Sequence, residues 1–339
     1  MITIGASTRK VGFPRICSAL APLLACLFAS APVISNAATI HVTGYEVLNF
    51  VTAAAGVPGY WGDLSFSSDG NTAYFIGESE SSGAGVWEAA VIRDGNGNVT
   101  GFGAAANIFL EDYIDTGLLH YPGSTTQFYR GYDGDDGDDY GIGQRTAGGA
   151  IEYKVINNYD AEYGGLAVVP DLYPNAGNLL SSSYGDGQIF LHSVSDDGDG
   201  TYTIGDGTLF ADYGVTSSVG DMEYVTSGPL ANTLIFTNWD DGGNQTVHYY
   251  SIDPATGLPV GGTTATPQLF VSGYDDAWGL SIDPVTDNIW LINYNDDPLL
   301  QITATATAVP EPSSIAMFGI GALGLFGYSR SRRQTSAAS

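Results

Sequence analysis

Acidic residues recur just before a set of similar short segments in the middle of the chain. Asp63 directly precedes Leu64, for example, and Asp221 directly precedes Met222. Carboxylates can hold a cation or accept hydrogen bonds from hydroxyl groups, and aromatic faces beside polar acceptors suit sugar recognition. If these segments met at one end of a channel, they would form an acidic ring that binds a cation or a polyhydroxy ligand. The candidate residues are Asp63, Asp115, Glu162, Asp221 and Asp276, with Trp61, Tyr163 and Trp278 nearby. The structural alternative is that the aromatic residues pack between elements and the acids cap loops.

A second candidate site is an aspartate-rich stretch. Five carboxylates within seven residues repel one another unless a cation or full hydration offsets the repulsion, and Ca²⁺ prefers oxygen ligands. The stretch therefore predicts a calcium site, with a polar hairpin tip as the alternative; its residues are Asp133, Asp135, Asp136, Asp138 and Asp139. Residues 94–98 and 197–201 begin like EF-hand loops, but they lack the glycine at position six and the glutamate at position twelve.

Familiar catalytic motifs are absent from the sequence. It contains no H-E-x-x-H, no G-x-S-x-G and no phosphate-binding loop. The histidines after residue 40 are scattered and fit ordinary strand positions; they are His41, His120, His192 and His248. We therefore predict no catalytic residue and expect a protein that is not an enzyme. The alternative is a secreted glycoside hydrolase, which would need two carboxylates about 5–10 Å apart.

Charge is distributed unevenly along the chain. The protein has 10 basic and 37 acidic residues, a formal net charge of −27, and residues 38–309 hold only four of the basic residues but 36 of the acidic ones. A surface this negative repels the phosphates of nucleic acids, so we expect no nucleic-acid partner.

The N-terminus has the features of a secretory signal peptide. Arg9, Lys10 and Arg15 form a basic region, residues 16–31 are apolar, and small residues at 35 and 37 favour cleavage after Ala37. We expect residues 1–37 to direct export through the Sec machinery. Both cysteines lie inside this segment, so the mature chain would have no thiol chemistry.

The C-terminus combines three features in order. The sequence Val309-Pro310-Glu311-Pro312 is followed by an apolar run over 315–328 and then by Arg330, Arg332 and Arg333. As a helix, 14 apolar residues span roughly 21 Å, less than the ~30 Å hydrocarbon core. Basic residues after the run favour a cytoplasmic tail, here 334–339. An ordinary membrane tail is the alternative explanation.

These residues resemble the PEP-CTERM sorting signal, which exosortases recognise and process in Gram-negative bacteria. The resemblance covers residues 309–333 and implies export with transient anchoring of segment 315–328 in the inner membrane. It also implies cleavage by an exosortase, followed by placement at the cell surface or in an exopolysaccharide matrix.

The middle of the chain, 38–308, repeats. Short runs rich in Val, Ile, Phe and Tyr alternate with Gly, Asp and Asn turns, so we expect an all-β fold. Five anchor residues start similar segments at spacings of 54, 48, 56 and 58; they are Leu64, Leu118, Leu166, Met222 and Leu280. About four strands per repeat predict a β-propeller of five blades. Six blades would follow if 123–160 held another repeat, and a β-sandwich is the rival fold.

The ends of the repeat array predict how the propeller closes. The last repeat ends after a third strand near 298–303, and the segment Glu46–Val51 precedes the first repeat as a fourth strand precedes the others. We expect this N-terminal strand to complete the last blade, which removes a free sheet edge.

Together these features predict an exported surface or exopolysaccharide-matrix protein whose acidic propeller binds polysaccharide or protein. The alternatives are a calcium-dependent adhesive module and the secreted glycoside hydrolase. Apart from Ca²⁺, no cofactor is expected.

Overall fold

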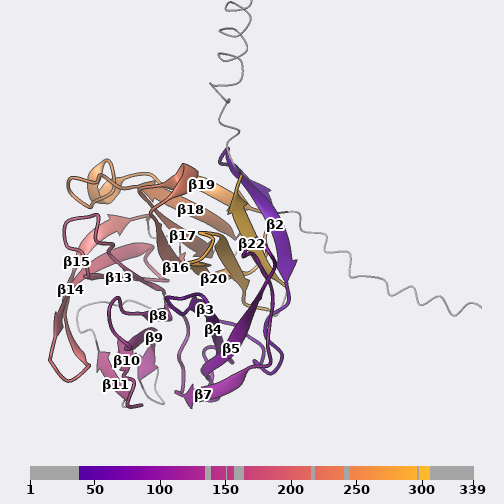
Figure 1. Ribbon diagram of the computed structural model, residues 1–339. Helices are drawn as coiled ribbons and strands as arrows, with labels where there is room; N and C mark the ends of the chain where they lie inside the picture. Colours follow the sequence, from indigo (N-terminus) through magenta and orange to yellow (C-terminus); the bar gives the residue numbers. More distant parts are fainter. Residues whose placement is uncertain are drawn as a thin grey trace, which may run out of the picture. The chain divides into compact units, whose positions relative to one another are not determined.

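The computed structural model describes residues 38–133, 139–149, 151–155, 164–214, 218–239, 245–295 and 298–305, with backbone alone at 132–133, 139–140 and 151–155. These residues form an all-β fold of five antiparallel sheets arranged in a ring, a five-bladed β-propeller (Figure 1). Figure 1 shows β3, β8, β16 and β20 near the centre and β7, β11 and β15 toward the rim. The prediction of an all-β propeller with five blades is therefore confirmed.

The five blades follow one another along the chain. The first blade contains β3 (Asp63–Phe66), β4 (Thr72–Gly77), β5 (Gly85–Arg93), β6 (Val99–Phe102) and β7 (Ala106–Leu110). The second contains β8 (Leu119–His120), β9 (Gln127–Asp133), β10 (Asp139–Arg145) and β11 (Ile151–Val155). The third contains β12 (Leu166–Val168), β13 (Leu179–Ser182), β14 (Gln188–Asp196) and β15 (Tyr202–Asp212).

The last two blades both take a strand from the N-terminal segment. The fourth contains β16 (Ser218–Val225), β17 (Thr233–Trp239), β18 (Thr246–Ser251), β19 (Gln268–Ser272) and β1 (Thr39–Ile40). The fifth contains β20 (Ala277–Ile282), β21 (Ile289–Asn293), β22 (Leu299–Ala304) and β2 (Tyr45–Val51). Two short 3-10 helices, Gly228–Leu230 and Gly262–Thr264, lie in connections of the fourth blade.

The N-terminal strand closes the ring as predicted. Strand β2 pairs antiparallel with β22, with Phe50 opposite Leu300. The preceding strand β1 pairs with β19 of the fourth blade, with Ile40 opposite Val271, a pairing that the repeat did not predict. The N-terminal segment therefore joins the last two blades before the chain enters the first one.

The possible sixth blade is absent from the fold. Within 123–160, β9, β10 and β11 pair with one another, and β9 pairs with β8, so the stretch completes one blade. The β-sandwich alternative is wrong because the five sheets surround an axis and do not stack as two layers (Figure 1).

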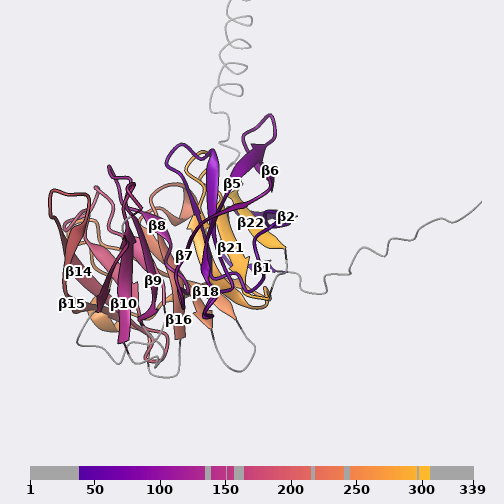
Figure 2. The ribbon, with the colours of Figure 1, turned by 90° about the horizontal axis from the view of Figure 1, so that it is seen from below.

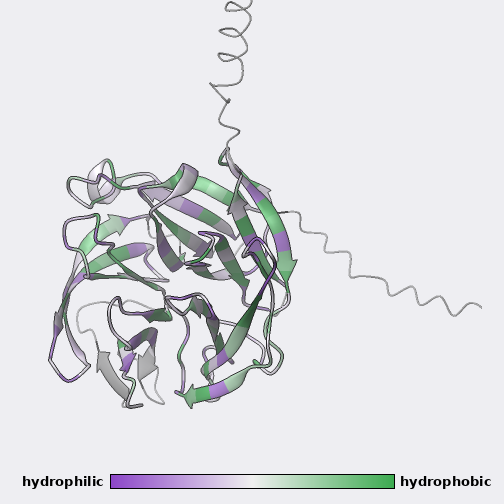
Figure 3. Cartoon of the chain, in the orientation of Figure 1, coloured by the Kyte–Doolittle hydropathy of each residue, from purple (hydrophilic) through white to green (hydrophobic). Residues whose placement is uncertain are grey.

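Local sequence explains the turns within the blades. Between β3 and β4, Asp69 accepts the backbone N–H of Asn71 at 3.0 Å, and Gly70 adopts a φ of 68° that suits glycine. The apolar residues lie mainly in the strands and the polar ones in the connections (Figure 3).

The core consists of five apolar clusters, one at each junction between neighbouring blades. Each of the five anchor residues lies in a different cluster, where it is at most 3% exposed. The anchors thus repeat because every blade must pack its inner strand against the preceding blade. This is the physical origin of the ~54-residue period.

The ring has two distinct ends, which the antiparallel order of the strands defines. We call the end at which the inner strands β3, β8, β12, β16 and β20 begin the entry mouth, and the opposite end the exit mouth. Figure 2 shows the blades from the side, with their strands running between the two ends. Because neighbouring strands are antiparallel, the second strand of each blade ends at the entry mouth.

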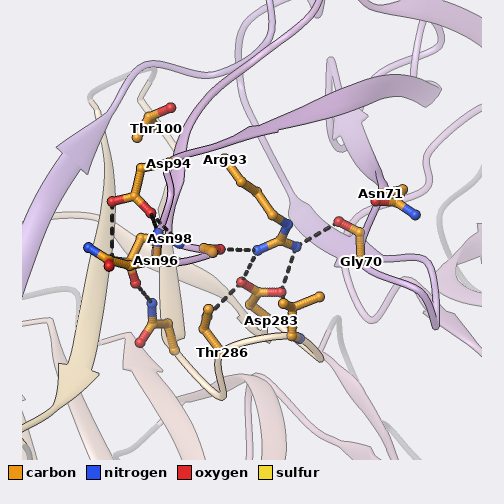
Figure 4. Close-up of polar contacts among 12 residues, drawn as sticks. Gly70, Asn71, Arg93, Asp94, Asn96, Asn98, Thr100, Asp283 and Thr286 are labelled. Carbon is orange, nitrogen blue, oxygen red and sulfur yellow. Dashed lines mark hydrogen bonds and ion pairs between the residues drawn. The ribbon is translucent and has the colours of Figure 1, made fainter.

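At the exit mouth, a buried ion pair joins the first and last blades (Figure 4). The guanidinium of Arg93 donates to both carboxylate oxygens of Asp283 at 2.6 and 2.8 Å, and to the carbonyls of Gly70 and Gly97. Beside it, Asp94 accepts the backbone N–H groups of Asn96 and Asn98. We call this group the Arg93 cluster; it comprises Gly70, Arg93, Asp94, Asn96, Gly97, Asn98, Asp283 and Thr286.

Candidate functional site

A cup lined by aromatic side chains opens at the entry mouth. It encloses about 280 Å³, and its lining residues are Glu80, Tyr184, Trp239, Trp278 and Tyr294. They come from the first, third, fourth and fifth blades. A concave apolar site with a few polar groups at one end of a ring of strands is a typical ligand site.

The rings of the cup stand nearly perpendicular to one another. Trp278 meets Trp239 at 89° and Tyr294 at 73°, with ring centroids 5.5 and 6.3 Å apart. Trp239 meets Tyr294 at 75°. Three walls therefore form a corner, and Tyr184 extends it by an edge contact with Trp278 at 5.3 Å. Such a corner surrounds a small ligand group on several sides with aromatic surface.

Two carboxyl groups accompany these rings. The carboxylate of Glu80 accepts a hydrogen bond from the Tyr294 hydroxyl at 3.2 Å, and burial raises the pKa of Glu80. Asp115 is fully buried, and its Oδ1 accepts hydrogen bonds from Trp278 Nε1 at 3.0 Å and from the Ser79 hydroxyl at 2.7 Å. Burial, and then the nearby Glu80, raise the pKa of Asp115 to about 8. Asp115 is therefore mostly protonated at neutral pH.

The second oxygen of Asp115 is the notable group. Asp115 Oδ2 is buried and has no hydrogen-bond partner among the described residues. An unsatisfied buried polar atom costs roughly 1–3 kcal/mol. Within the described ranges, Asp221 Oδ1 and Arg93 Nε also lack a partner, so this feature is not confined to the cup. Asp115 Oδ2 belongs to the residue that holds Trp278, the central wall of the cup.

The backbone around the cup is strained. Five non-glycine residues near the entry mouth adopt left-handed backbone, with φ between 48° and 62°; they are Tyr60, Glu78, Glu80, Tyr113 and Asp276. Each such residue costs of order 1 kcal/mol or more, and strain of this kind clusters at functional sites. Glu80 itself has a φ of 60°, so its carboxylate is placed in the cup at a cost in stability.

Two of the predicted ring acids meet at the axis of the propeller. Asp63 and Asp221 are each 2% exposed, and each carboxyl group shifts the pKa of the other. Asp63 accepts the backbone N–H groups of Leu64 and Leu118, and Asp221 accepts that of Leu280. Backbone hydrogen bonds from Met222 and Leu166 also lower the pKa of Asp221. Backbone groups of the anchor residues from all five blades therefore face two carboxyl groups.

This pair satisfies the inner edges of the sheets. The N–H groups of an edge strand need partners, and here two side chains provide them where no further strand can fit. Burial and then the neighbouring Asp221 raise the pKa of Asp63 well above its usual value, and burial raises that of Asp221 to about 7. A Cβ on Gly165 would collide with Asp221, so glycine leaves the space that the pair occupies.

Below this pair, a second recess opens at the exit mouth. It encloses about 310 Å³ and includes residues from the ends of all five inner strands, among them Ser65, His120, Glu223 and Ser281. Burial, and then Asp221, raise the pKa of Glu223 to about 8. Burial lowers the pKa of His120 to about 4. The axial carboxyl pair thus separates the cup from this recess.

The other predicted ring residues do not share the axis. Trp61 is buried in the apolar cluster between the fifth and first blades, so it packs in the core, as the structural alternative expected. Asp276 lies half-buried at the entry mouth, where its carboxylate accepts a hydrogen bond from Asn295. Glu162 and Tyr163 lie outside the described residues. The expected single ring is therefore divided between the axial pair Asp63 and Asp221 and the cup with Asp115 and Trp278.

The calcium prediction stays a prediction. Asp135, Asp136 and Asp138 lie outside the described residues, and only the backbone is described at Asp133 and Asp139. Within the described ranges, no group of three or more His, Cys, Asp or Glu side chains could hold a metal ion. At the other tip, Asp199 accepts hydrogen bonds from Thr201 in its own loop.

Sequence reasoning missed four of the five cup residues. Glu80, Tyr184, Trp239 and Tyr294 each lie at the end of the second strand of a blade or within three residues of it. An alignment of the repeats would have pointed to these four residues, because the second strand of each blade must end at the mouth where its inner strand begins. The prediction followed only the inner strands and so found Trp278 alone.

Comparison with protein families concerns the C-terminal segment. Residues 308–333 match the model of the PEP-CTERM protein-sorting motif. The chain carries a PEP-CTERM sorting motif. The motif confirms the resemblance found at 309–333, and it implies an exported protein that passes through a membrane-anchored stage, is processed by an exosortase, and reaches the surface or the extracellular space. In the part of the chain that the structure describes, no helix is long and apolar enough to cross a membrane.

Solved structures match this chain at low sequence identity. A luciferin-regenerating enzyme is 10% identical, with a TM-score of 0.45 over 76% of this chain and 94% of that one. The PQQ-bound aldose sugar dehydrogenase of Streptomyces coelicolor is 14% identical, with a TM-score of 0.42 over 79% and 98%. An engineered GH43 glycoside hydrolase is 10% identical, with a TM-score of 0.46 over 76% and 51%. No curated protein matches the chain in sequence.

Proposed function

We propose that this exported protein is a glycan-binding module and that the aromatic cup at the entry mouth is its binding site. The observation that carries the proposal is the corner of Trp239, Trp278 and Tyr294 with the Glu80 carboxylate beside it. Aromatic walls pack against the C–H faces of a sugar ring, and a carboxylate accepts hydrogen bonds from its hydroxyl groups. The sorting motif supports this proposal, because a protein delivered to the surface or the extracellular space meets polysaccharide there.

Binding fits the cup better than glycoside hydrolysis. A hydrolase needs two carboxyl groups that both reach the scissile bond. Glu80 lines the cup, but Asp115 is 0% exposed beneath Trp278 and Ser79. In our proposal Asp115 positions the Trp278 ring through its hydrogen bond to Nε1, and Glu80 contacts the ligand.

The test is oligosaccharide binding by variants of the cup. We expect Trp239→Ala to weaken binding of short β-linked hexose and hexosamine oligomers at least tenfold, since it removes one of three walls. Trp239 is only half-buried, so the variant should unfold at nearly the wild-type temperature. Isothermal titration calorimetry on the purified protein measures the affinity. Trp290, which is fully buried in the core, is unsuitable as a control, so Tyr249→Ala at a half-buried position on β18 serves instead. Equal affinities of wild type and Trp239→Ala would contradict the proposal.

A further inference from the structure

We propose that the glycan bound in the cup is cationic, a polymer of amino sugars with free amino groups. This inference rests on the proposed function and adds the substrate class. It starts from the shape of the cup, whose three mutually perpendicular rings enclose a corner. A flat sugar platform needs one open ring face, whereas these rings contact one another edge to face and so turn in different directions around a compact group. A cation is attracted to each ring face that it meets.

The carboxylate of Glu80 supplies the opposite charge at that corner. Its carboxylate lines the cup beside Tyr294, and burial raises its pKa, which means that the surroundings disfavour its negative charge. A ligand ammonium group next to Glu80 would stabilise the charged form. A neutral sugar would leave this cost in place.

The charges around the entry mouth extend this preference beyond the cup. Connections at this end carry the acidic residues Glu78, Glu80, Glu111, Asp112, Asp115, Asp186, Asp275 and Asp276. Among the described side chains, Arg93 and Arg145 stand at the strand ends of the exit mouth, and Arg130 is 3% exposed inside the second blade. Connections at the exit mouth carry acids as well, among them Asp69, Asp171 and Asp253, so the formal net charge of −27 draws a polycation to the whole surface and increases its rate of encounter. The aromatic corner and Glu80 then select the cup.

These steps lead to one ligand chemistry. The aromatic corner and Glu80 hold an ammonium group, and the acids around the mouth interact with further ammonium groups along the polymer. A polysaccharide of N-deacetylated hexosamines provides both a sugar ring and an amino group in each unit. A neutral or acidic polysaccharide provides no cation for Glu80.

The experiment compares glucosamine oligomers with N-acetylglucosamine oligomers of equal length, at a mildly acidic pH at which the free amines are protonated. Calorimetry on the purified protein should show at least tenfold tighter binding of the glucosamine series. Glu80→Gln should reduce that ratio to less than threefold, because only the glucosamine series places an ammonium group beside this carboxylate. The matched control is Glu88→Gln, which removes the same charge from an exposed position on the outer part of the first blade and should preserve the ratio.

The outcomes separate the two proposals. If both series bind equally and Trp239→Ala weakens both, the cup binds glycans and the cationic preference is wrong. If neither series binds, the proposed function itself is wrong. If oligolysine of equal charge binds as tightly as the glucosamine oligomers and Trp239→Ala leaves both unchanged, surface charge alone captures polycations, which overturns the inference.

Discussion

One buried carboxyl group lies beside the aromatic cup and another lies in the Arg93 cluster, but their hydrogen bonding differs. Both oxygens of Asp283 bond to Arg93, and the Thr286 hydroxyl also donates to it. Asp115 has one bonded oxygen, while the other has no partner among the described residues. The satisfied carboxylate joins the first blade to the last, and the unsatisfied one lies under a concave surface that is open to ligands.

The backbone shows the same contrast. In the Arg93 cluster, the left-handed positions are Gly70 and Gly97, which adopt them without a Cβ clash. Around the cup, left-handed positions are held by larger residues such as Glu80 and Tyr113. Left-handed residues other than glycine also occur at the exit mouth, where Asp287 with a φ of 55° follows Thr286, but five of them gather at the entry mouth and include Glu80 of the cup. This concentration of strain supports the cup as the functional region.

The largest expected effect comes from removing the ion pair of the Arg93 cluster. Arg93→Ala leaves the carboxylate of Asp283 buried without its cation, which costs about 3–5 kcal/mol. We expect the melting temperature to fall by roughly 10 °C. Urea unfolding monitored by tryptophan fluorescence measures the loss, and the double variant Arg93→Ala/Asp283→Ala should recover part of it. A loss below about 0.5 kcal/mol in the single variant would show that the pair does not hold the ring closed.

A smaller effect is expected from pH, because the buried acids of the cup and the axis have raised pKa values. The values are about 8 for Asp115 and about 7 for Asp221, and that of Asp63 is also raised. Between pH 6.5 and 8 the folded state binds more protons than the unfolded chain, so stability falls as pH rises. Burial lowers the pKa of His120, and likewise those of His192 and His248, to about 4, whereas the unfolded histidines still bind protons near their ordinary pKa of about 6.5. They therefore add a smaller slope of opposite sign, which fades by about pH 7.5.

If the folded state binds one proton more than the unfolded chain, the free energy of unfolding falls by about 1.4 kcal/mol per pH unit. From pH 6.5 to pH 8 this amounts to about 2 kcal/mol. Urea unfolding at a series of pH values measures the slope. A stability that rises from pH 6.5 to pH 8 would contradict the protonated state of these acids.

The smallest effect is expected from Asp115→Asn. At neutral pH this carboxyl is protonated, so an amide that keeps the acceptor for Trp278 and Ser79 should change stability by less than about 1 kcal/mol. The matched variant Asp283→Asn removes a charge that Arg93 needs and should cost several times more. Thermal unfolding of the two variants side by side measures the difference, and equal losses would remove the distinction between the two regions.

The sequence predicted the fold well because the fold repeats. Leu64, Leu166 and Leu280 each pack at a different blade junction, so their spacing reports the blade period directly. The closing strand β2 followed from counting strands in the last repeat. The pairing of β1 with β19 did not follow, since two residues carry too little pattern to assign a partner.

The site was predicted only in part. Acids near the anchors were expected to form one ring, but only Asp63 and Asp221 stand immediately before their anchors, where the other three blades have glycine. Asp115 stands three residues before Leu118 and therefore occupies a different level of the mouth. The division between the axial pair and the cup depends on which side chains line the cup, and sequence spacing does not contain that information.

Hydrogen exchange measured by mass spectrometry would locate the bound ligand on the protein. The purified protein would be compared with and without saturating glucosamine oligomers. We expect slower exchange in peptides at the entry mouth, namely those around Glu80, Tyr184, Trp239 and Tyr294. Peptides that contain Arg93 and Asp283 at the exit mouth should remain unchanged. Protection confined to the exit mouth, or to no region despite measured binding, would contradict the assignment of the cup as the binding site.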